Sequence, residues 1–202
     1  MRLILATKNS HKVAEIKAIL SNSDWEIIPM TELNNNIEII EDGVTFEENA
    51  RKKAEIVCER TGYICMGEDT GLEVDALNGQ PGIFSARFAG ENVTYEQNMQ
   101  KLLKLLQDVK KPNRFARFRC VCAIAFPKSL NRVTETFDGI CEGQIIEEPR
   151  GKVGFGYDPV FVPDEYEQTF AELPAQVKNK ISHRARALEK VRKYLEQIRF
   201  NE

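Results

Sequence analysis

Two adjacent acids lie in the middle of the stretch Tyr63-Ile-Cys-Met-Gly-Glu-Asp-Thr-Gly-Leu-Glu-Val-Asp-Ala76. The apolar residues 63–66 predict a short buried strand, which the Gly-Glu-Asp-Thr-Gly segment then interrupts. Over residues 72–76 apolar side chains alternate with acids, as they do in a half-buried strand. We therefore expect two strands joined by a loop that carries Glu68 and Asp69, and such loops often carry function.

Four helices are predicted around this stretch. Apolar residues at helical spacing indicate a helix over 10–20, capped by Asn9 or Ser10. Capping-box patterns open helices over 45–60 and 94–106, and Gly62 ends the first of these two. The clearest apolar face belongs to the last helix, over 182–198.

Further strands are predicted over 2–6, 118–126, 133–146 and 160–162, because apolar residues cluster or alternate there. Strands and helices interleave along the chain, which favours layered α/β packing. Short connections in the middle of the chain predict that part of the sheet is antiparallel. No linker or repeat divides the sequence, so we expect one domain over 1–202 with two lobes.

Composition excludes several classes of protein. The 202 residues carry a net charge of −3, whereas a protein that coats nucleic acid is usually strongly basic. No apolar run approaches the roughly 20 residues that cross a bilayer, and no signal peptide is recognisable. The five cysteines form no C-x-x-C pair, so neither a disulfide framework nor a zinc site is expected. We expect a cytoplasmic protein.

The first candidate binding segment is Thr7-Lys8-Asn9-Ser10-His11-Lys12, between a strand and a helix. Backbone N–H groups at a helix N-terminus, with hydroxyl and ammonium donors, suit an anion such as phosphate. The alternative is an ordinary capped turn with solvated lysines, which this segment taken alone favours.

The second candidate is a set of carboxylates. Glu41 and Asp42 precede a helix, and Glu68 and Asp69 lie where the strand is expected to break. Acids from separate segments, together with phosphate oxygens and water, are what Mg²⁺ prefers. Asp69 in this position can also deprotonate a water, although surface carboxylates are common.

Two later segments complete the candidates. Residues 151–159 read Gly-Lys-Val-Gly-Phe-Gly-Tyr-Asp-Pro, in which the aromatic side chains offer stacking surfaces for a base. Alternatively, this is a turn with its aromatics in the core. From Lys178 to Lys193 there are seven Lys or Arg and one acid. Cations at the start of a helix oppose its dipole, so His183 and Arg184 call for an anion, unless this is a solvated basic face.

The sequence resembles the inosine triphosphate pyrophosphatase family over nearly its whole length. Five segments carry the resemblance in order: TKNSHK, TFEENARKKA, EDTGLEVDALNGQPGIFSAR, GFGYDPVF and ISHRARAL. The resemblance implies an α/β fold with a long mixed central sheet flanked by helices, and two lobes around a substrate cleft. It also implies a homodimer that hydrolyses ITP, dITP and XTP to the monophosphate and diphosphate with Mg²⁺, and so removes them from the nucleotide pool.

The resemblance also implies roles for individual residues. Asp69 would be the proton acceptor and a metal ligand, Glu41 a second metal contact, and Glu68 a further metal candidate. The substrate would be held by Thr7, Lys8, Asn9, Ser10, His11, Lys12, Lys53, Thr70, Phe155, Gly156, Tyr157, Asp158, Lys178, His183 and Arg184. Preference for a 6-oxo purine needs a hydrogen-bond donor, which either Arg184 or a backbone N–H can supply.

Three other functions compete with this one. A septum-inhibitor-like pyrophosphatase would share the reaction but favour other nucleotides. A nucleotide sensor would bind without turnover, which the intact acidic centre argues against. An RNA-binding module would use only the basic C-terminal helix, and the net negative charge disfavours it. We therefore expect a small-molecule nucleotide as the partner, with no nucleic acid and no membrane.

Overall fold

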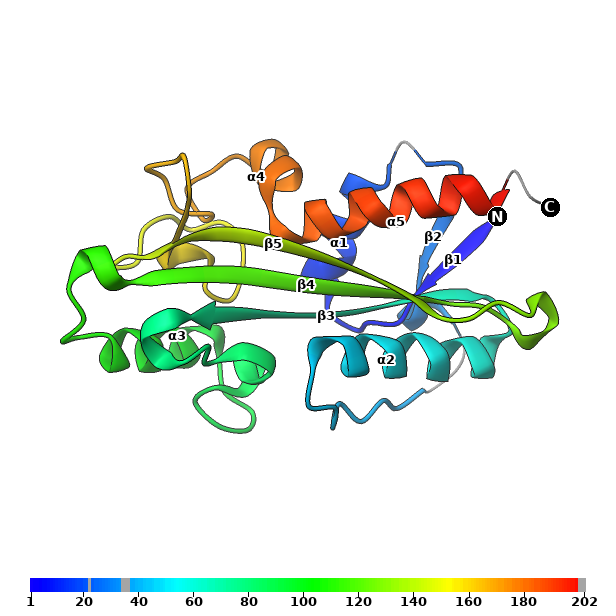
Figure 1. The fold of residues 1–202 in the computed structure, drawn as a ribbon, viewed down its shortest axis with the longest axis horizontal. Helices are drawn as coiled ribbons and strands as arrows, with labels where there is room; N and C mark the ends of the chain where they lie inside the picture. The colour runs from blue at the N-terminus through cyan, green and yellow to red at the C-terminus, as the bar shows by residue number, and fades with distance from the viewer. Residues whose placement is uncertain (22, 34–36, 200–202) are drawn as a thin grey trace. The chain divides into compact units, whose positions relative to one another are not determined.

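The computed structural model describes residues 1–21, 23–33 and 37–199 (Figure 1). The chain divides into two compact units. Unit 1 contains Met1–Asp69, Cys120–Gly139 and Arg184–Glu202. Unit 2 contains Thr70–Arg119 and Ile140–His183. Each unit has its own hydrophobic core.

Among the described residues, six strands form one mixed sheet in the order β2-β1-β3-β4-β5-β6. Strand β1 (Arg2–Leu5) pairs in parallel with both β2 (Glu26–Pro29) and β3 (Ile64–Val74). The remaining strands are β4 (Phe115–Ala125), β5 (Glu135–Ile145) and β6 (Phe161–Pro163), and β6 pairs antiparallel with β5. The predicted mixed sheet is confirmed.

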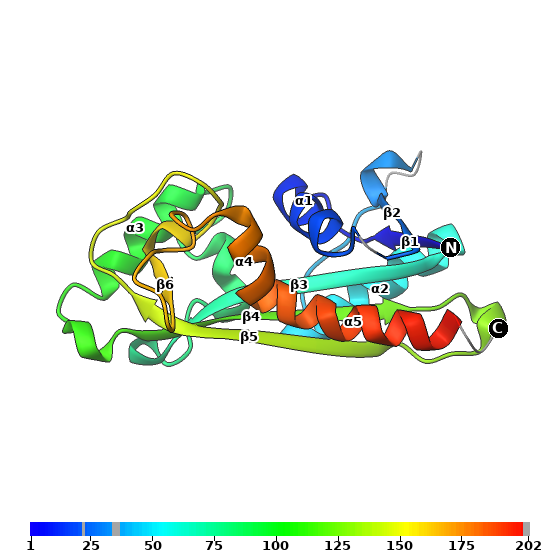
Figure 2. The same ribbon diagram turned by 90° about the horizontal axis from the view of Figure 1, so that it is seen from above.

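The helices of unit 1 cover both faces of its part of the sheet. They are α1 (Ser10–Ile19), α2 (Phe46–Thr61) and α5 (His183–Arg199). Buried side chains of α1 and α5 pack against β1, β3 and β4, with Leu5, Met66 and Val191 among them. Helix α2 lies on the opposite face from α5 (Figures 1 and 2). Successive side chains of a strand point to opposite faces of the sheet, so a strand of this unit contacts α1 and α5 with one set of side chains and α2 with the alternate set.

Helix α2 has the predicted cap residues at both ends, but the reciprocal bond of the predicted capping box comes from Val44 rather than from Thr45. Thr45 Oγ1 accepts a hydrogen bond from the N–H of Glu48 at 3.1 Å, and Val44 N–H donates to Glu48 Oε2 at 2.9 Å. Gly62 ends the helix in the left-handed conformation with φ of 70°. These contacts satisfy backbone groups that a helix end otherwise leaves unpaired.

Unit 2 is built around α3 (Tyr95–Leu105), α4 (Ala175–Ile181) and an aromatic core. The predicted capping box of α3 is present, with Thr94 and Gln97 bonding reciprocally. Short 3-10 helices occur in the described chain at Met30–Glu32, Asp75–Leu77, Gly82–Arg87, Lys111–Asn113, Lys128–Leu130 and Asp158–Val160.

The predicted break between residues 66 and 72 is wrong, because β3 runs without interruption from Ile64 to Val74. Gly67 does not end the strand. A Cβ there would lie 2.2 Å from the carbonyl oxygen of Ala50 and 2.6 Å from the backbone nitrogen of Ala54, both in α2. The glycine therefore marks a close approach of helix to strand rather than a turn. Strand β2 and helix α4 are too short to leave a periodic signal, and sequence reasoning missed both.

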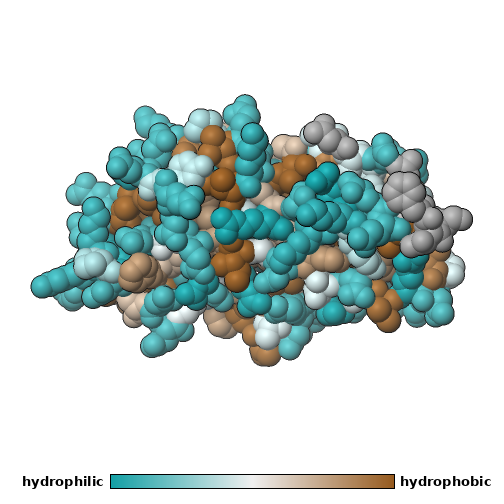
Figure 3. Space-filling model, turned by 45° about the horizontal axis from the view of Figure 1, so that its top comes forward, coloured by the Kyte–Doolittle hydropathy of each residue, from teal (hydrophilic) through white to brown (hydrophobic). Residues whose placement is uncertain are grey.

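On the face shown in Figure 3, hydrophilic residues cover most of the surface, and hydrophobic ones form scattered patches between them. No helix in the part of the chain that the structure describes has the length and apolar character needed to cross a membrane.

We expect Gly67→Ala to lower the free energy of unfolding by about 3 kcal/mol, the upper end of the range for overpacking, because the added methyl meets backbone atoms that cannot rotate away. Gly62→Ala is the matched control, since a Cβ there meets nothing within 4 Å and only the positive φ is strained. That control should cost about 1 kcal/mol. Equal losses in urea unfolding would contradict the close-approach explanation.

Candidate active site

A cluster of charged side chains in unit 1 surrounds Lys53. Its ammonium nitrogen lies 2.8 Å from Oδ1 of Asp69 and 2.9 Å from Oε2 of Glu41. Lys53 and Asp69 are only 5 % and 7 % exposed, whereas the side chain of Glu41 is 44 % exposed. Two carboxylates from separate segments thus converge on one cation, and Glu41 lies on the solvent side. The structure brings these three predicted site residues together.

The packing of α2 on β3 places this cluster. Asn49 and Lys53 are four residues apart in α2 and so share one face of the helix. Gly67 and Asp69 are two residues apart in β3 and share one face of the strand. The close approach at Gly67 therefore sets the Lys53 ammonium and the Asn49 amide beside Asp69, and Asn49 Nδ2 donates to Asp69 Oδ2 at 3.2 Å.

The protonation equilibria of the cluster differ between its two acids. Burial is the largest influence on Asp69 and raises its pKa, which the positive charges of Lys53 and Lys12 only partly offset. Burial also opposes ionisation of Glu41, but the charge and hydrogen bond of Lys53 outweigh it and lower the pKa of Glu41. The pKa of Lys53 is raised, because its two acidic partners outweigh the effect of burial. Asp69 is thus the better proton acceptor of the two acids.

The predicted phosphate segment follows the carboxyl end of β1. Ala6 N–H donates to the carbonyl of Met66 at 2.8 Å, so the Thr7–Lys12 loop begins beside β3, just before Glu68. Asn9 is the N-cap of α1, and its Oδ1 accepts from the N–H groups of His11 at 3.0 Å and Lys12 at 3.2 Å. Lys8, Ser10 and His11 are exposed. This is a helix N-terminus at the carboxyl end of a parallel strand, where anions commonly bind.

A second charged cluster occupies the other face of β3. Arg184 donates to both oxygens of Glu68, through Nε at 2.9 Å and Nη2 at 2.7 Å, and it also contacts Glu15 of α1. The ammonium of Lys12 lies 3.3 Å from Glu68. The side chains of Arg184 and Glu68 are each 1 % exposed. Burial opposes the charge on Arg184, but Glu68 and Glu15 raise the pKa of the guanidinium above its usual range.

These contacts change two expectations. The structure does not bring Glu68 together with Glu41 and Asp69, because consecutive residues of a strand point to opposite faces. The anion predicted near Arg184 is present, but it is supplied by the protein's own Glu68 and Glu15. Arg184 can therefore donate to a ligand only by giving up part of this bonding.

In unit 2 the predicted loop folds around Asp158. Its Oδ2 accepts from the ammonium of Lys178 at 2.6 Å and from the N–H of Phe155 at 2.9 Å. Gly154 has φ of +88°, and a Cβ there would lie 2.2 Å from the same oxygen, so glycine is required. The Lys178 ammonium also lies 5.1 Å from the centre of the Phe155 ring. This places a cation and a partly exposed aromatic ring side by side.

Other predicted residues of unit 2 are less accessible than expected. Tyr157 is 4 % exposed and donates to the carbonyl of Ser85 at 2.9 Å, so its ring belongs to the core and burial raises its pKa. His183 is 3 % exposed and stacks on Phe118, with ring centres 4.7 Å apart. The expected stacking surface at Tyr157 is therefore corrected to a core position. Gly156 is partly exposed in the same loop with φ of +65°, and Thr70 is half-buried in β3.

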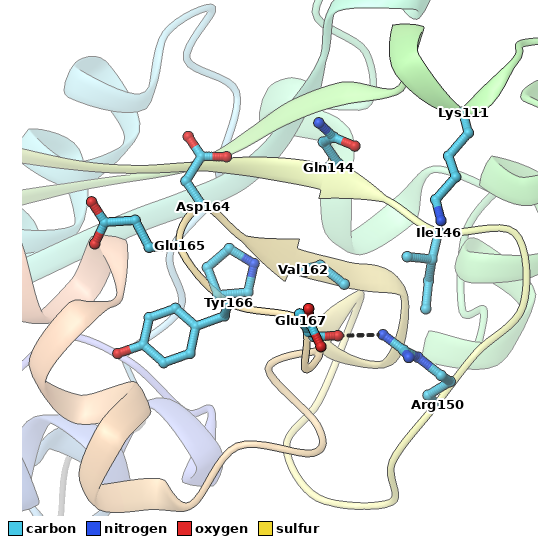
Figure 4. Close-up of a pocket in the computed structure, with 10 residues that line it drawn as sticks. Lys111, Gln144, Ile146, Arg150, Val162, Asp164, Glu165, Tyr166 and Glu167 are labelled. Atoms are coloured by element: carbon cyan, nitrogen blue, oxygen red, sulfur yellow. Dashed lines mark hydrogen bonds between the residues drawn. The ribbon is translucent and has the colours of Figure 1, made fainter.

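A separate open pocket of about 490 Å³ lies elsewhere in unit 2 (Figure 4). Its lining includes none of the predicted site residues. It is formed by Lys111, Gln144, Ile146, Arg150, Val162, Pro163, Asp164, Glu165, Tyr166 and Glu167.

Sequence reasoning missed two residues of the charged clusters. Asn49 lies one helical turn before Lys53, and that spacing is the signal that identifies it once Lys53 is a candidate. Glu15 lies one turn after the predicted loop and shows no comparable signal, because its partner Arg184 is 169 residues away in the chain.

A mixed α/β sheet with an acid–lysine cluster beside a polar strand-to-helix loop defines a class of protein suited to binding phosphates. Comparison with known proteins identifies the family. A model of the Ham1 family matches residues 3–194, and the chain belongs to this family.

Relatives and solved structures agree with this assignment. The chain is 49 % identical to the dITP/XTP pyrophosphatase of Bacillus licheniformis, over 96 % of this chain and 98 % of that protein. It is 50 % identical to the dITP/XTP pyrophosphatase of Thermoanaerobacter pseudethanolicus, over 96 % of each. A HAM1 protein from Coxiella burnetii matches with a TM-score of 0.87 and 41 % identity, over 98 % of this chain and 99 % of that structure.

We expect Arg184→Ala to lower the free energy of unfolding by about 3–5 kcal/mol, because it leaves the buried charge of Glu68 without its main partner. Arg192→Ala is the matched control on the same helix, since its ion pairs with Glu189 and Glu196 are exposed and should contribute little. Urea unfolding of both variants measures the difference. An Arg184→Ala variant as stable as the control would show that Glu68 is solvated or protonated.

Proposed function

We propose that this protein hydrolyses non-canonical purine nucleoside triphosphates, with dITP, ITP and XTP as substrates. The single observation that carries the proposal is the Asp69–Lys53–Glu41 cluster beside the Thr7–Lys12 loop in a member of the Ham1 family. The names of the Bacillus and Thermoanaerobacter relatives support the same substrates.

In the proposed reaction a water oxygen attacks the α-phosphorus, and the bond from that phosphorus to the bridging oxygen breaks. The monophosphate forms and diphosphate leaves. Asp69 accepts the proton of the attacking water, which its raised pKa favours. The ammonium of Lys53 and the donors of the Thr7–Lys12 loop hold the phosphate oxygens and spread their charge.

The donor set of unit 1 fits a magnesium ion. Glu41 and Asp69 offer hard carboxylate oxygens that already converge on one cation, the Lys53 ammonium. Within residues 1–21, 23–33 and 37–199, no group of three or more His, Cys, Asp or Glu side chains is placed to hold a metal. Water and phosphate oxygens would therefore supply the other ligands. When bound, Mg²⁺ would neutralise charge on the phosphates and on the leaving diphosphate.

Unit 2, taken by itself, offers a surface suited to a purine ring. The partly exposed ring of Phe155, with the Lys178 ammonium 5.1 Å from its centre, offers a flat surface for a purine. The buried ion pair of Lys178 with Asp158 fixes the loop that carries this ring. A hydrogen-bond donor of the protein that faces the 6-oxo group would remain unpaired opposite an adenine, which disfavours ATP.

We further propose that the protein is a cytoplasmic homodimer, which removes these nucleotides from the nucleotide pool.

The proposed reaction predicts which phosphorus is attacked. With dITP, ITP or XTP and Mg²⁺, inorganic phosphate should appear only when inorganic pyrophosphatase is added to the assay, because the direct product is diphosphate. The three 6-oxo substrates should have a higher kcat/KM than ATP. Phosphate release without the added enzyme would mean hydrolysis at the γ-phosphate and would overturn the proposal.

We expect Asp69→Asn to lower kcat about 10²–10⁴-fold, because the amide keeps the shape of the side chain but cannot accept the proton. Asp75→Asn is the matched control, since that acid is exposed and pairs with Arg117 at 2.9 Å, outside the charged cluster of unit 1. Its kcat should stay within twofold of the wild type. A normal kcat in Asp69→Asn would remove Asp69 from the reaction.

A further inference from the structure

The side chain of Asn49 links two segments of unit 1 that carry the proposed metal and proton-transfer residues. Its Nδ2 donates to Asp69 Oδ2 at 3.2 Å, and its Oδ1 accepts from the N–H of Gly43 at 2.8 Å. Asn49 is 2 % exposed. Gly43 is two residues from Glu41, so one amide joins the segment of Glu41 to Asp69.

We propose that Asn49 is a positioning residue, which holds the Asp69 carboxylate and the Glu41 segment in register for the reaction. This inference rests on the function proposed above and adds a residue to its machinery. It also assigns a reason for the glycine at position 43.

The two ends of the Asn49 amide are not interchangeable. Because Gly43 offers an N–H, the oxygen must face Gly43, and the NH₂ group must then face Asp69. Lys53, one helical turn later, donates to the other oxygen of Asp69 at 2.8 Å. Each oxygen of Asp69 thus has its own donor from α2, and together these two bonds fix the plane of the carboxylate. A carboxylate at position 49 would instead set oxygen against oxygen.

The bond of Asn49 to Gly43 is one of the contacts that hold the segment carrying Glu41, together with the ion pair of Glu41 with Lys53. Residues 37–43 have no helix or strand of their own, so side-chain contacts must hold them. A Cβ at Gly43 would lie 2.6 Å from Asn49 Oδ1 and 2.9 Å from Glu48 Cβ. Position 43 therefore has no room for a side chain while Asn49 keeps its bond. The hydrogen bond between the N–H of residue 43 and the side chain of residue 49 therefore requires both a glycine at 43 and a side-chain acceptor oxygen at 49.

Two variants break this contact from opposite sides. Asn49→Asp keeps the size and the acceptor for the N–H of Gly43 but removes the donor to Asp69 and to the Gly43 carbonyl, which lies 3.5 Å away. Gly43→Ala keeps asparagine at position 49, but the added methyl group displaces the Asn49 side-chain oxygen. Both should lower kcat for dITP about 10–100-fold, the usual cost of losing an outer partner of a ligand, with KM changed less than threefold.

Asn98→Asp is the matched control. Asn98 is also 2 % exposed, and its amide also bonds the backbone, accepting from Ala89 N–H at 2.7 Å and donating to the Ala86 carbonyl at 3.0 Å. It lies in unit 2, outside the charged clusters. This variant should lose stability but keep a kcat within twofold of the wild type.

A second measurement needs neither metal nor turnover. In metal-free protein, amide hydrogen exchange of residues 37–45 should be faster in Asn49→Asp and Gly43→Ala than in the wild type, while exchange in the middle of α2 stays unchanged. If wild-type protein has no activity on any of the nucleotides, the proposed function fails, and this exchange result still reports on the contact. If the wild type is active and either variant keeps a kcat within twofold of it, Asn49 is not a positioning residue. Unchanged exchange of residues 37–45 would equally overturn the inference.

Discussion

The approach of α2 to β3 at Gly67 is the constraint on which the charged cluster of unit 1 depends. The helix backbone lies where a Cβ of residue 67 would otherwise be, so the side chains of Asn49 and Lys53 reach the strand directly. A wider separation would lengthen the contact between Lys53 and Asp69 beyond an ion pair. The strength of a charged contact in a buried site falls steeply with distance and solvation. A backbone contact without charge thus determines the electrostatics of the site.

Strand alternation gives the adjacent acids Glu68 and Asp69 different surroundings. Asp69 faces α2 and has a lysine and an amide as partners, and its pKa is raised. Glu68 faces α1 and α5, and its two oxygens accept from Nε and Nη2 of Arg184. The carboxylate of Glu68 thus has its hydrogen-bonding capacity taken up by the protein's own guanidinium. One dipeptide therefore supplies both an acid of the Lys53 cluster and an acid that ties helices to the sheet.

Local rules predicted much of the fold, whereas contacts between distant residues were out of reach. The caps at Thr45 and Thr94 and the glycine stop at residue 62 depend on neighbours within four residues, and the structure has each of them, although the full capping box forms only at Thr94. Gly67 was misread because a glycine needed for close approach looks the same in sequence as one needed for a turn. Tertiary packing determines the burial of Tyr157 and His183. It also determines the pairing of Arg184 with Glu15, and no local sequence pattern indicates either outcome. The carboxylates were candidates from their place in the sequence, whereas Lys53 was identified only through the family resemblance.

Buried ion pairs recur in both units: Lys53 with Asp69, Arg184 with Glu68, and Lys178 with Asp158. Such pairs add little net stability compared with apolar side chains of the same size, because both charges lose their hydration. Their value must then lie in what the charges do. The ion pair of Arg184 with Glu68 specifies how α5 packs on β3, because only one placement of the helix lets Nε and Nη2 each reach an oxygen of Glu68. The pairs of Lys53 and Lys178 instead keep a partner that is less buried, Glu41 in one unit and Phe155 in the other. Each of these cations is therefore approached from solvent on the side of its less buried partner, and an anion that binds Lys53 must take over part of its bonding to Glu41.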